Sequence, residues 1–181
     1  ACGTMDTSYF NPYARKAAEW TGGKLTDENR DRLRNLPDQL RTGTFEFYHG
    51  SPLDPLREYI TTERQAASAL DAVDTNRLGV GHTHQPVLYR KEKGTYRGIT
   101  INGDDEFFGI DSSERIVFNP GSVGQPRDGD PRAAYVTVEG DLTGTVNLRW
   151  HRVDYDVETT QAAIRSAGLP EPLAERLRQG R

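Results

Sequence analysis

The stretch LGVGHTHQP, residues 78–86, places two histidines one residue apart, directly after a short apolar run. In an open α/β sheet, the carboxyl ends of the strands meet the crevice that binds ligands. Imidazole is the commonest metal-binding side chain, and in an extended backbone His82 and His84 would point to the same side. The pair is therefore predicted to bind one metal ion or two adjacent ones. The alternative is a polar loop that happens to contain two histidines.

Two further histidines lie close to apolar runs of the strand type. His49 follows TGTFEFY, in which Phe45 and Phe47 alternate with polar residues. A single histidine after a strand is usually a hydrogen-bonded loop residue, so His49 alone is a weak candidate ligand. His151, in RWHRVDY, lies among alternating polar positions and is interpreted as an exposed structural residue.

The periodicity of the rest of the chain predicts an α/β (α+β) layout. Capping patterns at Asn11-Pro12, at Thr26 and at Thr62 with Gln65 indicate where helices begin. The first helix is expected to end at Gly22-Gly23, and a helical tail to be split at 168–172. Strands are predicted at 44–48, 78–80, 87–89, 96–101, 116–118, 134–138 and 146–150, and the polar segment 91–115 is interpreted as an inserted hairpin.

Composition limits the classes of function. The 181 residues suit one domain, and the net charge of −4 without a basic block argues against nucleic acid as the main partner. The single cysteine, Cys2, leaves no internal disulfide or thiolate cluster, which favours a cytoplasmic protein with histidine, carboxylate and amide ligands. The sequence contains no apolar run of about 18 residues, so no membrane span is predicted.

A third polar segment, residues 117–135, begins as a strand and becomes a short loop. Asn119-Pro120 ends the strand, Gly121 permits a sharp turn, and Ser122 and Arg127 add polar donors. Exposed backbone amides together with Arg127 would suit a phosphate group. The alternative is an ordinary tight loop between strands.

The segments YHGSP, GHTHQP and NPGSVGQPRDGDPRAAY, in this order, resemble the carboxyl-terminal signature of the calcineurin-like metallophosphoesterase superfamily. The similarity extends over almost the whole chain and is greatest to the small bacterial and archaeal phosphodiesterase or phosphatase branch. It implies a β-sandwich flanked by helices, with a centre of two divalent metal ions at the strand ends. The expected metal is manganese, with iron, zinc or nickel as alternatives, and the expected activity is hydrolysis of phosphoesters by a metal-activated water.

The resemblance also implies roles for individual residues. His49 and His82 resemble ligands of the second metal, and His84 resembles a ligand of the first. Asn119, Ser122 and Arg127 are expected to contact the substrate. Expected partners are therefore a phosphoester substrate and a second copy of the chain in a homo-oligomer, with nucleic acid relevant only as a nucleotide substrate and no membrane involved.

The chain departs from the superfamily pattern in its motifs. It lacks the Asp-x-His motif, the Gly-Asp motif of the bridging aspartate and the Gly-Asn-His-Asp or -Glu motif of the acid histidine, and residues 91–115 are longer than expected. Residues 1–181 are therefore expected to be the carboxyl-terminal portion of a single domain that is amino-terminally incomplete, with the catalytic histidine upstream and no activity alone. The alternative is a non-catalytic metal- or ligand-binding protein that keeps the fold.

Overall fold

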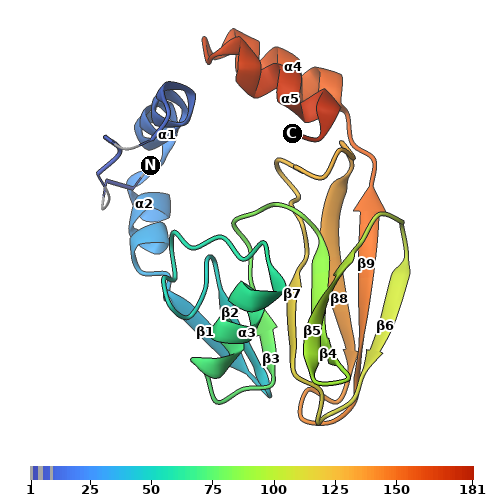
Figure 1. Cartoon of the computed structure of the whole chain (residues 1–181). Coiled ribbons are helices and arrows are strands. Elements are labelled where there is room, and N and C mark those ends of the chain that lie inside the picture. The colour runs from blue at the N-terminus through green and yellow to red at the C-terminus, as the bar shows by residue number, and fades with distance from the viewer. Residues whose placement is uncertain (1, 4–5, 9) are drawn as a thin grey trace. The chain divides into compact units, whose positions relative to one another are not determined.

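The computed structural model describes residues 2–3, 6–8 and 10–181 (Figure 1). Its helices are α1 (Pro12–Lys24), α2 (Asp27–Arg34), α3 (Glu63–Asp71), α4 (Val157–Ser166) and α5 (Glu171–Gln179). Its strands are β1 (Gln39–Thr42), β2 (Phe45–Tyr48), β3 (Arg77–Gly79), β4 (Val87–Glu92), β5 (Thr95–Thr100), β6 (Glu106–Ile110), β7 (Ile116–Asn119), β8 (Ala133–Gly140) and β9 (Val146–Val153).

The chain forms two compact units, and each is described by itself. One unit comprises Ala1–Pro37 and Asp156–Gln179, and the other comprises Asp38–Tyr155 and Gly180–Arg181. The first unit contains α1, α2, α4 and α5, and the second contains α3 and both sheets.

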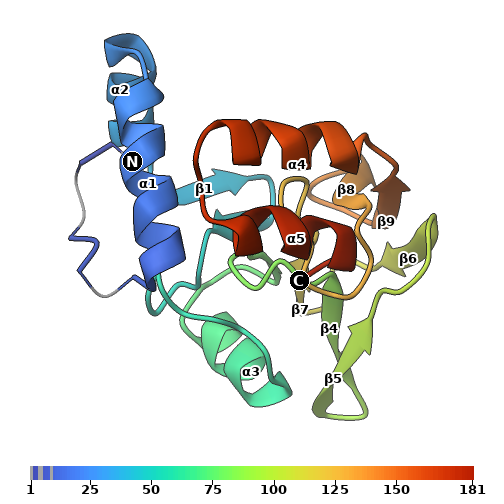
Figure 2. The ribbon, with the colours of Figure 1, turned by 90° about the horizontal axis from the view of Figure 1, so that it is seen from above.

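The helices of the first unit begin at the predicted caps. The Asn11 side chain accepts a hydrogen bond from the Ala14 amide at 2.9 Å. Helix α1 continues through the two glycines to Lys24 instead of ending there, because the Leu25 amide still bonds the Thr21 carbonyl at 3.0 Å. Figure 2 shows α4 and α5 side by side, and the buried Gln161 amide joins them by donating to the Ala174 carbonyl at 2.8 Å.

The larger unit contains a mixed sheet of six strands in the order β1-β2-β3-β7-β4-β5. Strands β2, β3 and β7 are parallel neighbours, whereas β1, β4 and β5 join antiparallel. Helix α3 packs against β5 and β7. A core of Ala66, Leu70, Leu78, Tyr89 and Val117 fills this side of the sheet.

A second antiparallel sheet, in the order β6-β9-β8, makes the larger unit a sandwich. Leu88 and Phe118 are next in sequence to Tyr89 and Val117, which belong to the core beside α3. Leu88 and Phe118 join Leu148 and Trp150 of β9 in a second core. This alternation along β4 and β7 is the pattern of a sheet buried on both faces. The predicted α/β class with a β-sandwich is confirmed.

Two strands differ from the sequence-based expectation. Strand β1 is exposed along its length and has no apolar alternation, so it carries no strand signal. Residues 91–115 contain the end of β4, all of β5 and also β6, which pairs with β9 in the other sheet. In the described part of the chain, no helix has the length and apolar character needed to cross a membrane.

Candidate metal centre

Parallel strands β2 and β3 deliver two histidine segments to the same edge of the six-stranded sheet. His49 follows β2 directly, and His82 lies three residues beyond Gly79, the last residue of β3. The Gly81 amide donates to the His49 carbonyl at 2.9 Å, so the two chains stay in contact after the strands end. The sequence-based expectation that strand ends bring these segments together is confirmed.

The side chains of His49 and His82 face each other. His49 Nε2 lies 2.8 Å from His82 Nδ1, and the ring centroids are 4.6 Å apart. Two nitrogens that bind one zinc-like ion at about 2.0–2.1 Å in tetrahedral geometry lie roughly 3.3 Å apart. A small rotation of the two rings, with the shared proton moved off the facing nitrogens, would therefore let both nitrogens bind one ion.

The environment keeps both imidazoles in the neutral form that binds metals. Partial burial of the ring lowers the pKa of His49 below its usual value. Burial also lowers the pKa of His82, and the nearby charges of His49, His84 and Arg127 lower it further. Because a lowered pKa means loss of the proton at a lower pH, both rings keep a lone pair at neutral pH.

The backbone of the HxH segment is not extended. His82 has a φ of 64° and His84 a φ of 60°, both in the left-handed region. The expectation that the two rings point to the same side of an extended chain is therefore wrong, because the segment turns back on itself at Gly81, where the Thr83 amide bonds the Gly81 carbonyl at 2.7 Å.

His84 faces a neighbouring loop. Its Nδ1 donates to the Gln125 carbonyl at 2.7 Å, which leaves Nε2 as the nitrogen with the lone pair, the usual arrangement of a metal-binding histidine. Within the described residues, no three His, Cys, Asp or Glu side chains form a group that could hold a metal ion. The structure thus pairs His49 with His82 and does not add His84 or a carboxylate to them. The pair fits a single ion, and the described set is incomplete for two ions.

The loop from Asn119 to Arg127 lies beside these histidines, as predicted. The Asn119 side chain is fully buried and donates to the Gly81 carbonyl at 2.7 Å and to Thr83 Oγ1 at 3.0 Å. Its own oxygen accepts the Gly121 amide at 2.9 Å. The observed contacts of Asn119 are therefore to the protein, and they fix the HxH segment against the loop.

Ser122 and Arg127 lie within the same loop. Ser122 Oγ accepts the amides of Gly124 and Gln125 at 3.2 and 2.9 Å, which closes a tight turn. The Arg127 amide donates to the His84 carbonyl at 3.2 Å, and its guanidinium donates to Gln125 Oε1 at 3.2 Å. Arg127 is therefore near the histidines, whereas a phosphate contact by either residue stays a prediction.

Sequence reasoning did not identify two features next to the histidines. The Tyr59 ring stacks on His82 with centroids 3.9 Å apart. Thr83, the residue between His82 and His84 in sequence, lines a pocket of about 270 Å³. The other lining residues are Ile60, Thr61, Gln85, Pro86, Val87, Tyr89, Thr100 and Asp128. Neither follows a sequence motif, because the stack depends on the path of the loop 50–62 and the pocket is formed by segments that are distant in sequence.

His151 lies away from the candidate centre, within β9. Its Nε2 is 2.9 Å from Thr137 Oγ1 on β8, and its ring stacks on Tyr135. It is half-buried rather than fully exposed, because both neighbours lie on the adjacent strand. The structural interpretation of His151 agrees with these contacts.

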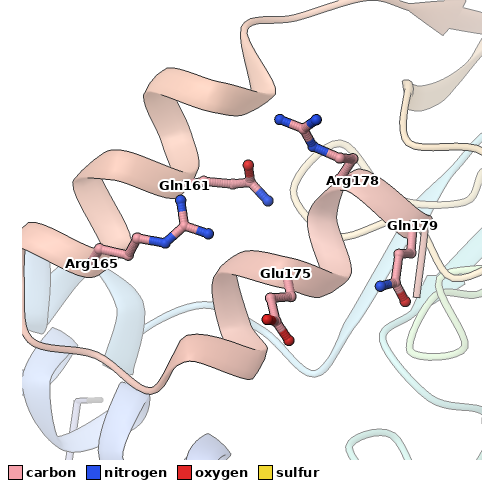
Figure 3. A pocket seen from close by; sticks show the side chains of 5 residues that line it. All are labelled: Gln161, Arg165, Glu175, Arg178 and Gln179. Atoms are coloured by element: carbon pink, nitrogen blue, oxygen red, sulfur yellow. The ribbon is translucent and has the colours of Figure 1, made fainter.

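A larger pocket of about 350 Å³ lies between α4 and α5 and is lined by polar side chains (Figure 3). Arg165 pairs with Glu171 at 2.6 Å, and Arg178 pairs with Glu158 at 2.8 Å. Glu175 adds a negative charge to the lining. Both arginines of the lining already have carboxylate partners, so neither offers an unpaired positive charge to a ligand.

Comparison with known proteins identifies the family. No protein-family model matches the chain. The chain is 31% identical over 190 residues to the uncharacterized protein MJ0912 of Methanocaldococcus jannaschii, a match that covers 99% of the chain and 71% of that protein. The crystal structure of a metallophosphoesterase from Sphaerobacter thermophilus is similar with a TM-score of 0.84 and 42% identity, over 99% of this chain and 72% of that one.

A more distant structure shares the fold alone. The hypothetical protein PH1004 from Pyrococcus horikoshii OT3 matches with a TM-score of 0.73 and 20% identity, over 96% of this chain and 62% of that one. Together with the histidine pair at the ends of parallel strands, the similarity to the Sphaerobacter enzyme over nearly the whole chain gives the assignment: the chain belongs to the calcineurin-like metallophosphoesterase superfamily.

Proposed function

We propose that this chain carries part of a two-metal centre that hydrolyses phosphoesters, either phosphodiesters or phosphomonoesters. The observation that supports this most directly is the 2.8 Å approach of His49 Nε2 to His82 Nδ1 at the edge of the sheet where β2 and β3 end. Both rings are kept neutral by burial, as metal ligands must be.

His49 and His82 would hold one divalent ion, and His84 would bind a second through Nε2. Manganese is the proposed metal, with iron, zinc or nickel as alternatives. When bound, such ions supply Lewis-acid activation of the phosphoryl group and of water. The bridging carboxylate would have to come from residues other than those described, since no carboxylate joins the histidine pair among them.

The chain's own residues would orient the substrate. Arg127, which lies within electrostatic range of His82, would bind a non-bridging phosphoryl oxygen, and the turn at Ser122 would offer amide and hydroxyl donors. The pocket that begins at Thr83 would receive the organic group of the ester, because apolar Ile60, Val87 and Tyr89 line it beside polar Gln85.

A second candidate function is a non-catalytic metal-binding protein that keeps this fold. The incomplete ligand set among the described residues favours it. It differs from the hydrolase in one measurable property, since it would bind a metal ion without turning over any phosphoester.

The test is an assay of the natural full-length protein with an aryl phosphodiester and an aryl phosphomonoester at increasing manganese. His82→Ala should abolish any metal-dependent turnover, because it removes half of the histidine pair. His151→Ala, which changes a histidine of β9 with no part in the centre, is the matched control and should leave turnover unchanged. Binding of manganese without turnover would favour the non-catalytic candidate, and no binding at all would sink both.

Within the same assay, Arg127→Ala tests the substrate contact. If Arg127 binds the ground and transition states equally, the variant should raise KM and leave kcat unchanged. If KM and kcat are both unchanged, the loop has a structural role only.

A further inference from the structure

Tyr59 makes a close ring contact in the candidate centre. Its ring lies 3.9 Å from the His82 ring, centroid to centroid, with an angle of 24° between the planes. The Tyr59 side chain nevertheless remains 44% exposed, so burial in the core does not explain its position. The stacked face of the tyrosine covers one face of the imidazole.

We propose that Tyr59 is a positioning residue that keeps the His82 imidazole facing His49, close to the orientation in which both rings bind one metal ion, an inference that rests on the proposed function. His82 is otherwise restrained by the contact with His49 and by a hydrogen bond to the backbone of Arg57. Both contacts act on ring nitrogens, in the plane of the imidazole. The Tyr59 ring instead packs on one face of the imidazole and so limits the tilt of its plane.

The loop that carries Tyr59 is held firmly enough for this role. The Gly50 amide donates to the Pro55 carbonyl at 2.7 Å, and Asp54 Oδ1 accepts the Arg57 amide at 3.0 Å. The chain thus leaves β2 at His49 and turns through 50–58 before Tyr59 reaches His82. No side chain can be added at Gly50 without closing to 2.5 Å from the Asp54 carbonyl, which keeps this turn tight.

Tyr59 itself is fixed at its backbone. The Gln65 amide group of α3 donates to the Tyr59 carbonyl at 2.8 Å. The next residue, Ile60, is buried in the core beneath α3. Helix α3 therefore fixes the backbone of Tyr59, and this connects the core to the candidate centre.

The protein contains a matched pair for comparison. Tyr135 stacks on His151 with centroids 4.7 Å apart and an angle of 20°, and it is 40% exposed. This is the same kind of contact, but it is made to a histidine that does not belong to the candidate centre. A substitution of Tyr135 therefore controls for the general effect of losing a stacked tyrosine.

The experiment is a titration of residues 1–181 with Co²⁺, followed by the visible absorption of histidine-bound cobalt. Tyr59→Leu should weaken cobalt binding at least about 10-fold, the lower end of the usual effect of groups that orient a metal ligand. Tyr59→Phe keeps the ring and should bind as the wild type does. Tyr135→Leu should also leave cobalt binding unchanged. Equal affinity of Tyr59→Leu and wild type would overturn the proposal.

A second measurement separates this proposal from the proposed function. The imidazole proton resonances of His82 in the metal-free chain should show an upfield ring-current shift that Tyr59→Leu removes and Tyr59→Phe retains. If the wild type gave no cobalt spectrum, the metal assignment under the proposed function would fail, and the His82 resonances would then decide the positioning role alone. Absence of the shift in the wild type would overturn it.

Discussion

At the scale of single residues, the backbone at His82 and His84 is the least expected feature. Both have a positive φ, a conformation that costs an L-residue with a Cβ about 1–2 kcal/mol. Strain of this kind concentrates at functional sites. Here the turned backbone directs the His82 ring towards His49 and the His84 ring towards Gln125, although the two histidines are close in sequence.

This strain predicts an order of stability for two variants at one position. His82→Gly and His82→Ala both remove the ring, but only alanine keeps a Cβ in the left-handed conformation. We expect the glycine variant to be more stable than the alanine variant by about 1 kcal/mol in urea unfolding. An alanine variant as stable as the glycine variant would mean that the segment relaxes once the imidazole is gone.

At the scale of elements, the loop from Asn119 to Arg127 is shaped by close packing as well as by hydrogen bonds. Gly121 has a φ of 89°, and a Cβ placed there would lie 2.8 Å from the Ala134 Cβ and from Pro86. Pro86 belongs to the segment that follows His84, so the same contact joins the loop to the histidines. Gly124, three residues later, faces open space.

The two glycines give a matched prediction. Gly121→Ala should lower the free energy of unfolding by about 2–4 kcal/mol, because it adds backbone strain to a steric clash. Gly124→Ala should be neutral or stabilising by up to about 1 kcal/mol, since it only restricts the unfolded chain. Thermal and urea unfolding of both variants would check this, and equal losses in the two would refute the packing argument.

Elements with a local signal could be predicted from the sequence. Phe45 and Phe47 alternate with polar residues and form β2, and Thr62 with Gln65 caps α3 as expected. Strand β1 could not be predicted, because its four residues are exposed and show no apolar alternation, and it joins the sheet by pairing with β2. The site shows the same division. The strand ends predicted the positions of His49 and His82, whereas the stack of Tyr59 on His82 could not be predicted, because it depends on the path of a loop.

At the scale of the larger unit, the two sheets are held together by a shared core and by hydrogen bonds of buried arginines, among them Arg77. Arg77 on β3 donates to Thr44 Oγ1 at 3.1 Å and to the Gly144 carbonyl, which belong to the turns of different sheets. Its guanidinium lies 5.2 Å from the Phe45 ring centroid. Burial lowers the pKa of Arg77, although not enough to remove its charge at neutral pH.

The inter-sheet core predicts a contrast along one strand. Leu148 on β9 is fully buried between the sheets, whereas Val153 at the end of β9 is 46% exposed. Leu148→Ala should cost about 2–5 kcal/mol of unfolding free energy, because it leaves a cavity that the two sheets cannot close. Val153→Ala should change it by no more than about 0.5 kcal/mol. Urea unfolding measures both, and a loss below about 1 kcal/mol for Leu148→Ala would show that the two sheets close on the cavity.

The buried Trp150 of β9 gives the protein an internal optical reporter. Its indole is 1% exposed, packs edge-to-face on Phe118 and donates Nε1–H to the Asn119 carbonyl at 3.1 Å. The other tryptophan, Trp20, is 39% exposed and can be replaced by phenylalanine to leave a single emitter. Because Asn119 also binds the Gly81 carbonyl, the fluorescence of Trp150 would register movement of the histidine segment directly, without any label attached to the chain.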